Sequence, residues 1–129
     1  MPHIPTASSL RAILFLDAAA CVAMAIPLTM GAEPIAELTR LPQPLLFFAG
    51  LSLLPVAALI VVIARWFERG RAVWLVIGGN AAWIAASLAL IAGVAAPNAW
   101  GVAFILAQAL AVAVLTGMEY VAVRSAPTA

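Results

Sequence analysis

Residues 10–30 read LRAILFLDAAACVAMAIPLTM, and this stretch decides the fold. It holds two charged side chains, Arg11 near its start and Asp17 inside the apolar run. A helix needs about 20 mostly apolar residues to cross a lipid bilayer. The stretch meets that requirement, so we expect a membrane-spanning helix with an ionisable group inside it.

The composition of the whole chain leads to the same conclusion. Of the 129 residues, 67% are hydrophobic and 9% are charged, and lysine is absent. A soluble domain usually has about a quarter of its residues charged, because its surface has to hold water. So few charges cannot form a water-facing shell, and we therefore expect lipid to surround most of the chain.

Three further apolar stretches also have the length of a membrane span. The four predicted spans cover residues 10–30, 43–64, 72–95 and 99–122. No stretch alternates apolar and polar residues as a half-buried strand does, and lipid tolerates only helices or closed barrels. The predicted fold class is therefore all-α, a bundle of four transmembrane helices that forms one domain over residues 1–129.

The positions of the arginines predict the orientation. With four spans, both termini and the middle loop lie on one side of the membrane, and every arginine except Arg40 falls on that side. The positive-inside rule then places both termini in the cytoplasm, and we expect a bacterial inner membrane. The alternative for residues 10–30 is a cleavable signal peptide, whose removal would leave three spans.

The two halves of the chain are faintly alike. The segments RAILFLDAAACVAMAI (11–26) and RAVWLVIGGNAAWIAASLAL (71–90) both begin with Arg-Ala and place a polar residue before Ala-Ala. This alignment matches Asp17 with Asn80. Either the chain consists of two parallel helical-hairpin repeats, or two alanine-rich segments align this well through composition alone.

Polar residues on three spans fall at similar depths in the membrane. By the helical rise, Asp17 lies roughly 9 Å from Arg11, Asn80 about 13 Å from Arg71, and Glu119 some 8 Å from Arg124. Helical spacing adds three residues to the same faces. The predicted intramembrane polar cluster comprises Asp17, Asn80, Trp83, Ser87, Gln108 and Glu119.

The acids of this cluster have two interpretations. An ionisable group at membrane depth usually marks a path for protons, ions or substrate, because burying its charge costs about 2.5–3.5 kcal/mol. Alternatively, Asp17 holds helices together through hydrogen bonds, and Glu119 reaches the headgroups or pairs with an arginine. The sequence leaves both interpretations open.

Small residues recur at every fourth position of the last two spans. Such rows let helix backbones approach closely in lipid, either within one bundle or between copies. The predicted packing residues are Ala81, Ala85, Ala89, Gly93, Ala109, Ala113 and Gly117.

Two loops complete the set of predicted features. Arg65, Arg69 and Arg71 of the middle loop are candidates for binding lipid headgroups or simply for fixing the topology. The outer segment PIAELTRLP (34–42) is either a short helix lying along the membrane interface or an ordinary loop.

The residue inventory makes an enzyme the least favoured class. Cys21 and His3 are the only cysteine and histidine. The chain therefore cannot form a disulfide within itself, and it lacks the residues for a nucleophile–base pair or a metal site. We expect no cofactor and no metal, and a net charge of +1 gives no reason to expect nucleic acid.

Two classes of function remain. The first, which the sequence favours slightly, is a non-catalytic structural or accessory subunit that packs against itself or a larger membrane complex within the bilayer. The alternative is a small dimeric proton-coupled transporter or channel, in which Asp17, together with Glu119, is the intramembrane carboxylate.

Overall fold

The computed structural model describes residues 7–67 and 71–125. Within these ranges the chain is helical and contains no strand. The elements in chain order are α1 (Ala7–Met30), α2 (Ala32–Thr39), α3 (Gln43–Trp66), α4 (Ala72–Ala89), the π-helical turn η1 (Leu90–Val94) and α5 (Ala99–Ser125).

Four of these helices are long and apolar enough to cross a membrane. They comprise Leu10–Met30, Gln43–Trp66, Ala72–Gly93 and Ala99–Ser125. Large apolar side chains such as Leu16, Phe48, Leu75 and Leu110 lie exposed on all four helices, which suits an exterior solvated by lipid. These four helices lie within a few residues of the four predicted spans, and the chain has the properties of a multi-pass membrane protein.

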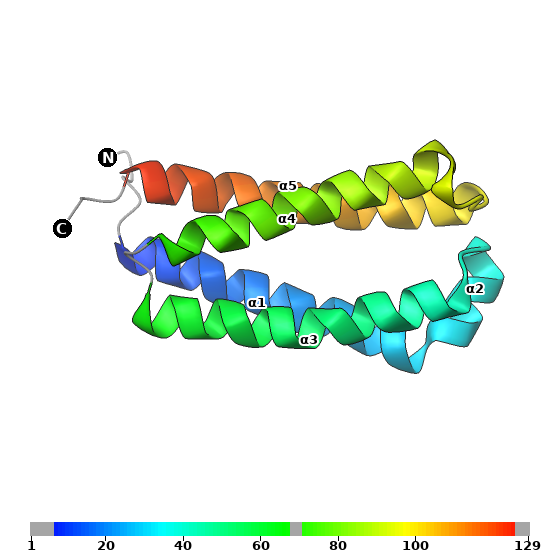
Figure 1. Ribbon diagram of the computed structural model, residues 1–129, viewed down its shortest axis with the longest axis horizontal. Helices are drawn as coiled ribbons and strands as arrows, with labels where there is room; N and C mark the ends of the chain where they lie inside the picture. The colour runs from blue at the N-terminus through cyan, green and yellow to red at the C-terminus, as the bar shows by residue number, and fades with distance from the viewer. Residues whose placement is uncertain (1–6, 68–70, 126–129) are drawn as a thin grey trace.

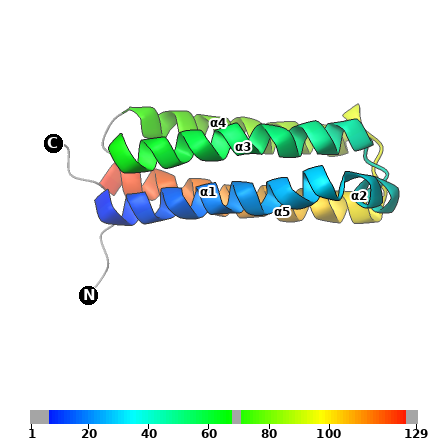
Figure 2. The same cartoon turned by 90° about the horizontal axis from the view of Figure 1, so that it is seen from below.

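The four long helices run up and down and are organised as two pairs (Figures 1 and 2). The most extensive contacts join α1 to α3 and α4 to α5. The two pairs meet mainly through α1 and α5, whereas α3 and α4 hardly touch. The interior therefore has a closed side, between α1 and α5, and a weakly closed side, between α3 and α4.

The outer segment predicted as either helix or loop forms the helix α2. Its C-cap, Arg40, has a left-handed backbone with φ 60°, and the Arg40 N–H bonds to the Ala36 carbonyl. The Asn98 N–H donates to the Thr39 carbonyl at 3.1 Å, and its Nδ2 donates to the Leu38 carbonyl at 2.7 Å. These bonds fasten α2 to the start of α5, so α2 closes one end of the bundle (Figure 2).

A glycine allows the closest approach between α1 and α3. A Cβ atom added at Gly50 would lie 2.6 Å from Leu28 Cβ and 3.1 Å from the Thr29 backbone nitrogen. Both neighbours belong to the main body of α1 and cannot move aside as a flexible side-chain end could. The spacing of this helix pair therefore depends on the missing side chain at position 50.

We predict that Gly50→Ala lowers the free energy of unfolding by about 1–3 kcal/mol, because overpacking forces the two backbones apart. Gly78→Ala is the matched control, since an added Cβ there meets no atom within 4 Å. It should leave stability unchanged or raise it, because alanine favours a helix. Denaturant titration in mild detergent measures both, and equal effects would contradict the assigned α1–α3 contact.

Candidate intramembrane polar site

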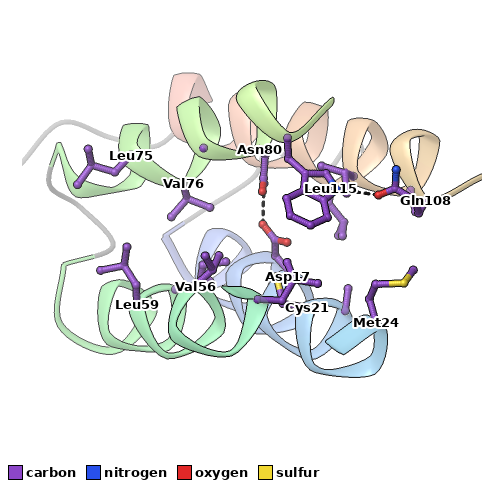
Figure 3. Close-up of a pocket in the computed structure, with 17 residues that line it drawn as sticks. Asp17, Cys21, Met24, Val56, Leu59, Leu75, Val76, Asn80, Gln108 and Leu115 are labelled. Atoms are coloured by element: carbon purple, nitrogen blue, oxygen red, sulfur yellow. Dashed lines mark hydrogen bonds between the residues drawn. The ribbon is translucent and has the colours of Figure 1, made fainter. Parts of the chain in front are cut away.

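Three buried polar side chains from three helices meet inside the bundle. Nδ2 of Asn80 on α4 donates to Oδ2 of Asp17 on α1 at 2.8 Å and to Oε1 of Glu119 on α5 at 3.1 Å. Asp17 is 2% exposed, Asn80 8% and Glu119 0%. Figure 3 shows the bond between Asp17 and Asn80 crossing from one helix pair to the other. This Asp17–Asn80–Glu119 bridge joins α1, α4 and α5.

The bridge has more acceptors than donors. Two ionised carboxylates present four oxygen atoms, and the Asn80 amide supplies two N–H groups. Both go to the acids, and Oε2 of Glu119 is buried without a hydrogen-bond partner among the described residues. One proton shared by the pair would provide the missing donor.

Electrostatic repulsion also disfavours a bridge in which both acids are ionised. Oδ2 of Asp17 and Oε1 of Glu119 both bond to one nitrogen, so they lie at most about 6 Å apart, a range at which like charges disfavour joint ionisation. The surroundings are protein and lipid rather than water, which strengthens that repulsion. Two negative charges in the bridge therefore repel each other, and a proton or a cation beside them would reduce that repulsion.

A second network lies one to two helical turns further along α4. Nε1 of Trp83 donates to Oε1 of Gln108 at 2.7 Å, and Nε2 of Gln108 donates to the Ser87 hydroxyl at 3.0 Å. The Ser87 hydroxyl donates in turn to the Trp83 carbonyl at 2.8 Å. This Trp83–Gln108–Ser87 network joins α4 to α5. The structure thus brings the six predicted polar residues together as two adjoining networks, a three-helix bridge and a two-helix link.

The bridge forms part of the wall of a cavity of about 220 Å³ between the two helix pairs (Figure 3). Asp17, Asn80, Trp83 and Gln108 are among the polar residues that line it, whereas Glu119 lies behind Asn80 and does not. Cys21, one turn after Asp17 on α1, lines the same wall. Most of the remaining wall is apolar, so a carboxyl group borders a space suited to an oily molecule.

This cavity opens toward the membrane. Its lining includes Val56 and Leu59 of α3 and Leu75 of α4, which are 40%, 49% and 66% exposed. Figure 3 shows Leu59 and Leu75 on opposite sides of the gap between the pairs. Because α3 and α4 hardly touch, this side of the cavity is not closed by a helix–helix contact. Sequence reasoning missed these apolar residues, which carry no signal beyond that of any lipid-facing position.

The rows of small residues are mostly not packing contacts within the bundle. Ala109 is buried, but all the other predicted packing residues are exposed: Ala81, Ala85, Ala89, Gly93, Ala113 and Gly117. Gly93 also has φ 136°, so the helix ends there rather than continuing the row. The residues of α4 that face inward are instead Val73, Val76, Asn80 and Ser87. The expectation that these exposed residues pack within the bundle is therefore wrong. Packing between copies of the chain stays a prediction.

The arginines of the middle loop lie at one end of the bundle. Arg65 and Arg71 are exposed, and the Arg65 guanidinium lies 5.3 Å from the centre of the Trp66 ring. Arg69 lies outside the described residues. A role in binding lipid headgroups stays a prediction for all three. Among the described residues, no group of three or more His, Cys, Asp or Glu side chains could hold a metal ion.

Comparison of the chain with protein-family models, curated proteins and solved structures found no match. The chemistry of the site therefore follows from its own residues.

We predict that Asn80→Leu lowers the free energy of unfolding by about 1–3 kcal/mol, because each buried carboxyl then loses the amide donor. Glu119→Gln should cause no such loss, because it keeps the shape of the side chain and adds N–H donors beside Asp17. Denaturant titration in mild detergent compares the two variants. If Asn80→Leu is as stable as the unaltered chain, the bridge does not hold the helix pairs together.

Proposed function

We propose that this chain is a small proton-coupled transporter of the bacterial inner membrane that exchanges a proton for a lipophilic cation. One observation carries the proposal: Asp17, which the Asn80 amide joins to a second buried carboxyl group, Glu119, borders a cavity whose wall includes exposed residues of α3 and α4. A purely structural network has no need of an adjoining cavity or of two acids that share too few donors. An ionisable group with access to a path through the membrane is the usual mark of transport.

The exchange follows from the charge of the pair. With one proton, the pair carries one negative charge. If that proton leaves, two negative charges remain close together, a state that is costly away from water. A cation in the cavity beside Asp17 would offset the second charge. Proton and cation therefore stabilise the same pair in turn, which is the requirement for exchanging one for the other.

The titratable groups around this pair are few. Asp17 and Cys21 come from α1 and Glu119 from α5, whereas α4 contributes the uncharged Asn80 and α3 contributes apolar residues to the cavity. Arg11, nearer the start of α1, donates from Nε to the Ala64 carbonyl at 3.1 Å. Among the described residues, the ionisable groups at and next to the cavity are therefore the two carboxyl groups and the Cys21 thiol.

The proposed orientation places both termini and the middle loop in the cytoplasm. The even number of spans and the arginines at the end of the bundle that holds Arg65, Arg71 and Arg124 support it. The two-pair architecture also suits an origin from two parallel hairpin repeats, in which Asp17 and Asn80 would hold equivalent positions.

The test of transport uses the whole chain in liposomes with a pH-sensitive dye in the lumen. The probes are ethidium, tetraphenylphosphonium and dodecyltrimethylammonium, whose fixed charges prevent them from carrying protons themselves. We expect at least one of them to move protons against a protein-free control, and Asp17→Asn to abolish the movement. Ser52→Ala, on an exposed part of α3, should retain it. If Asp17→Asn lowers stability but leaves proton movement intact, Asp17 does not couple the exchange.

A second candidate function is that of a structural or accessory subunit, non-catalytic, that binds a second copy or a larger membrane complex. The exposed small residues of α4 favour it, since Ala81, Ala85 and Ala89 leave that face free for close contact with another helix. This function and transport are compatible if the transporter works as a dimer. The interface would then lie on the α4 face, away from the contact between α1 and α5.

We predict that Ala85→Leu disrupts any association made through this face, because the larger side chain prevents close approach of the helices. Ala58→Leu, at an exposed position of α3, is the matched control and should leave association unchanged. Chemical cross-linking in native membranes, followed by purification in mild detergent, measures the associated fraction. Equal association of both variants and the unaltered chain would exclude this face.

A further inference from the structure

A second cavity, of about 180 Å³, lies between the halves of the helices nearer to α2. Its wall is mainly aliphatic and aromatic, and includes Leu28 of α1, Leu46 of α3, Leu90 of η1 and Phe104 of α5. No charged residue is among those that line it. We call it the outer cavity, and the cavity beside Asp17 the inner cavity.

The two cavities share a partition. Met24, Trp83 and Gln108 line both of them. Met24 is a flexible, unbranched side chain that adapts readily to a neighbour, whereas Trp83 is held by its hydrogen bond to Gln108. The cavities therefore adjoin at these three side chains, and Met24 is the flexible one among them.

The two cavities lie one after the other along the helices. Along α4 and η1 the lining extends from Leu75 to Leu90, which is about 22 Å at the helical rise. The carboxyl group of Asp17 belongs to the inner cavity only. The space therefore has a negative group beside one segment and an uncharged, oily wall over the other.

The path of entry also restricts the ligand. Leu45, on the wall of the outer cavity, is 37% exposed, and the inner cavity reaches the surface beside Leu59 and Leu75. Both openings lie in the membrane-spanning part of the bundle. A molecule that uses them has to partition into lipid first, and this requires an apolar portion.

We propose that the two cavities are one binding site for a single-chain amphiphile with a protonated primary amine. The ammonium group lies against Asp17 in the inner cavity, and the alkyl chain passes Met24 into the outer cavity. The proposal rests on the function proposed above and names the class of cation exchanged.

The carboxyl group of Asp17 selects the headgroup. It lines the inner cavity and accepts a hydrogen bond from Asn80 at Oδ2, and a primary ammonium offers it three further N–H donors together with a positive charge. A quaternary ammonium offers the charge without donors, and an alcohol offers a donor without the charge. A primary amine supplies both, so it should bind most tightly of the three.

The test measures binding to the full chain in phosphatidylcholine nanodiscs by titration calorimetry, with empty nanodiscs subtracted. The probes are dodecylamine, dodecyltrimethylammonium, dodecanol and butylamine. We expect dodecylamine to bind at least about tenfold more tightly than dodecanol, the scale of hydrogen bonds to a charged group. Butylamine, which lacks the long chain, should bind weakly, and Asp17→Asn should remove the preference for dodecylamine.

The outer cavity is tested by filling it. Ala49 of α3 lines the outer cavity, and Ala58 of the same helix lines neither. We expect Ala49→Phe to weaken dodecylamine binding by at least about tenfold, and Ala58→Phe to leave it unchanged. If Ala49→Phe does not fold, Ala86→Leu fills the same cavity from α4.

The outcomes separate this inference from the proposed function. Equal binding of dodecanol and dodecylamine, or unchanged binding after the outer cavity is filled, would overturn the inference, even if other cations move protons. Tight binding of dodecylamine that depends on Asp17 and Ala49, without any proton movement in liposomes, would support the inference and contradict transport.

Discussion

The structure depends on one amide that holds two buried acids. Asn80 donates from one nitrogen to Asp17 and to Glu119. The bond to Asp17 joins the two helix pairs, and the bond to Glu119 joins α4 to α5 within one pair. In water, such a contact would compete with hydration and contribute little to stability. Here the three side chains are buried, and helices in lipid lack the hydrophobic driving force that packs them in water. Polar contacts therefore contribute a larger share of what fixes the register of α1, α4 and α5.

The sequence predicted the bridge because helical geometry is simple. Counting the rise per residue from the flanking arginines places Asp17, Asn80 and Glu119 at similar depths. The cost of leaving an acid or amide in lipid then requires the three to face one another. Trp83 fits the same reasoning, because an indole N–H group at this depth needs a partner, and it donates to Gln108.

The rest could not be read from the sequence because lipid and protein interior select for the same residues. In a soluble protein, Ala81, Ala85 and Ala89 would be assigned to the core, since exposed apolar rows are costly in water. In lipid the exposure of these alanines costs little, so their spacing says nothing about which face is inside. The same ambiguity hides the cavity: Val56 and Leu59 differ in no way from their lipid-facing neighbours.

Because the helices form two pairs, the bridge also borders a cavity. If α3 and α4 packed as closely as α1 and α3 do around Gly50, the acids would be sealed in, and their number of protons would have no consequence. The weak contact between α3 and α4 leaves space beside Asp17. In the proposed exchange, a ligand in that space would lie beside the interaction that aligns three helices. Binding and helix register would then be linked through the same three side chains.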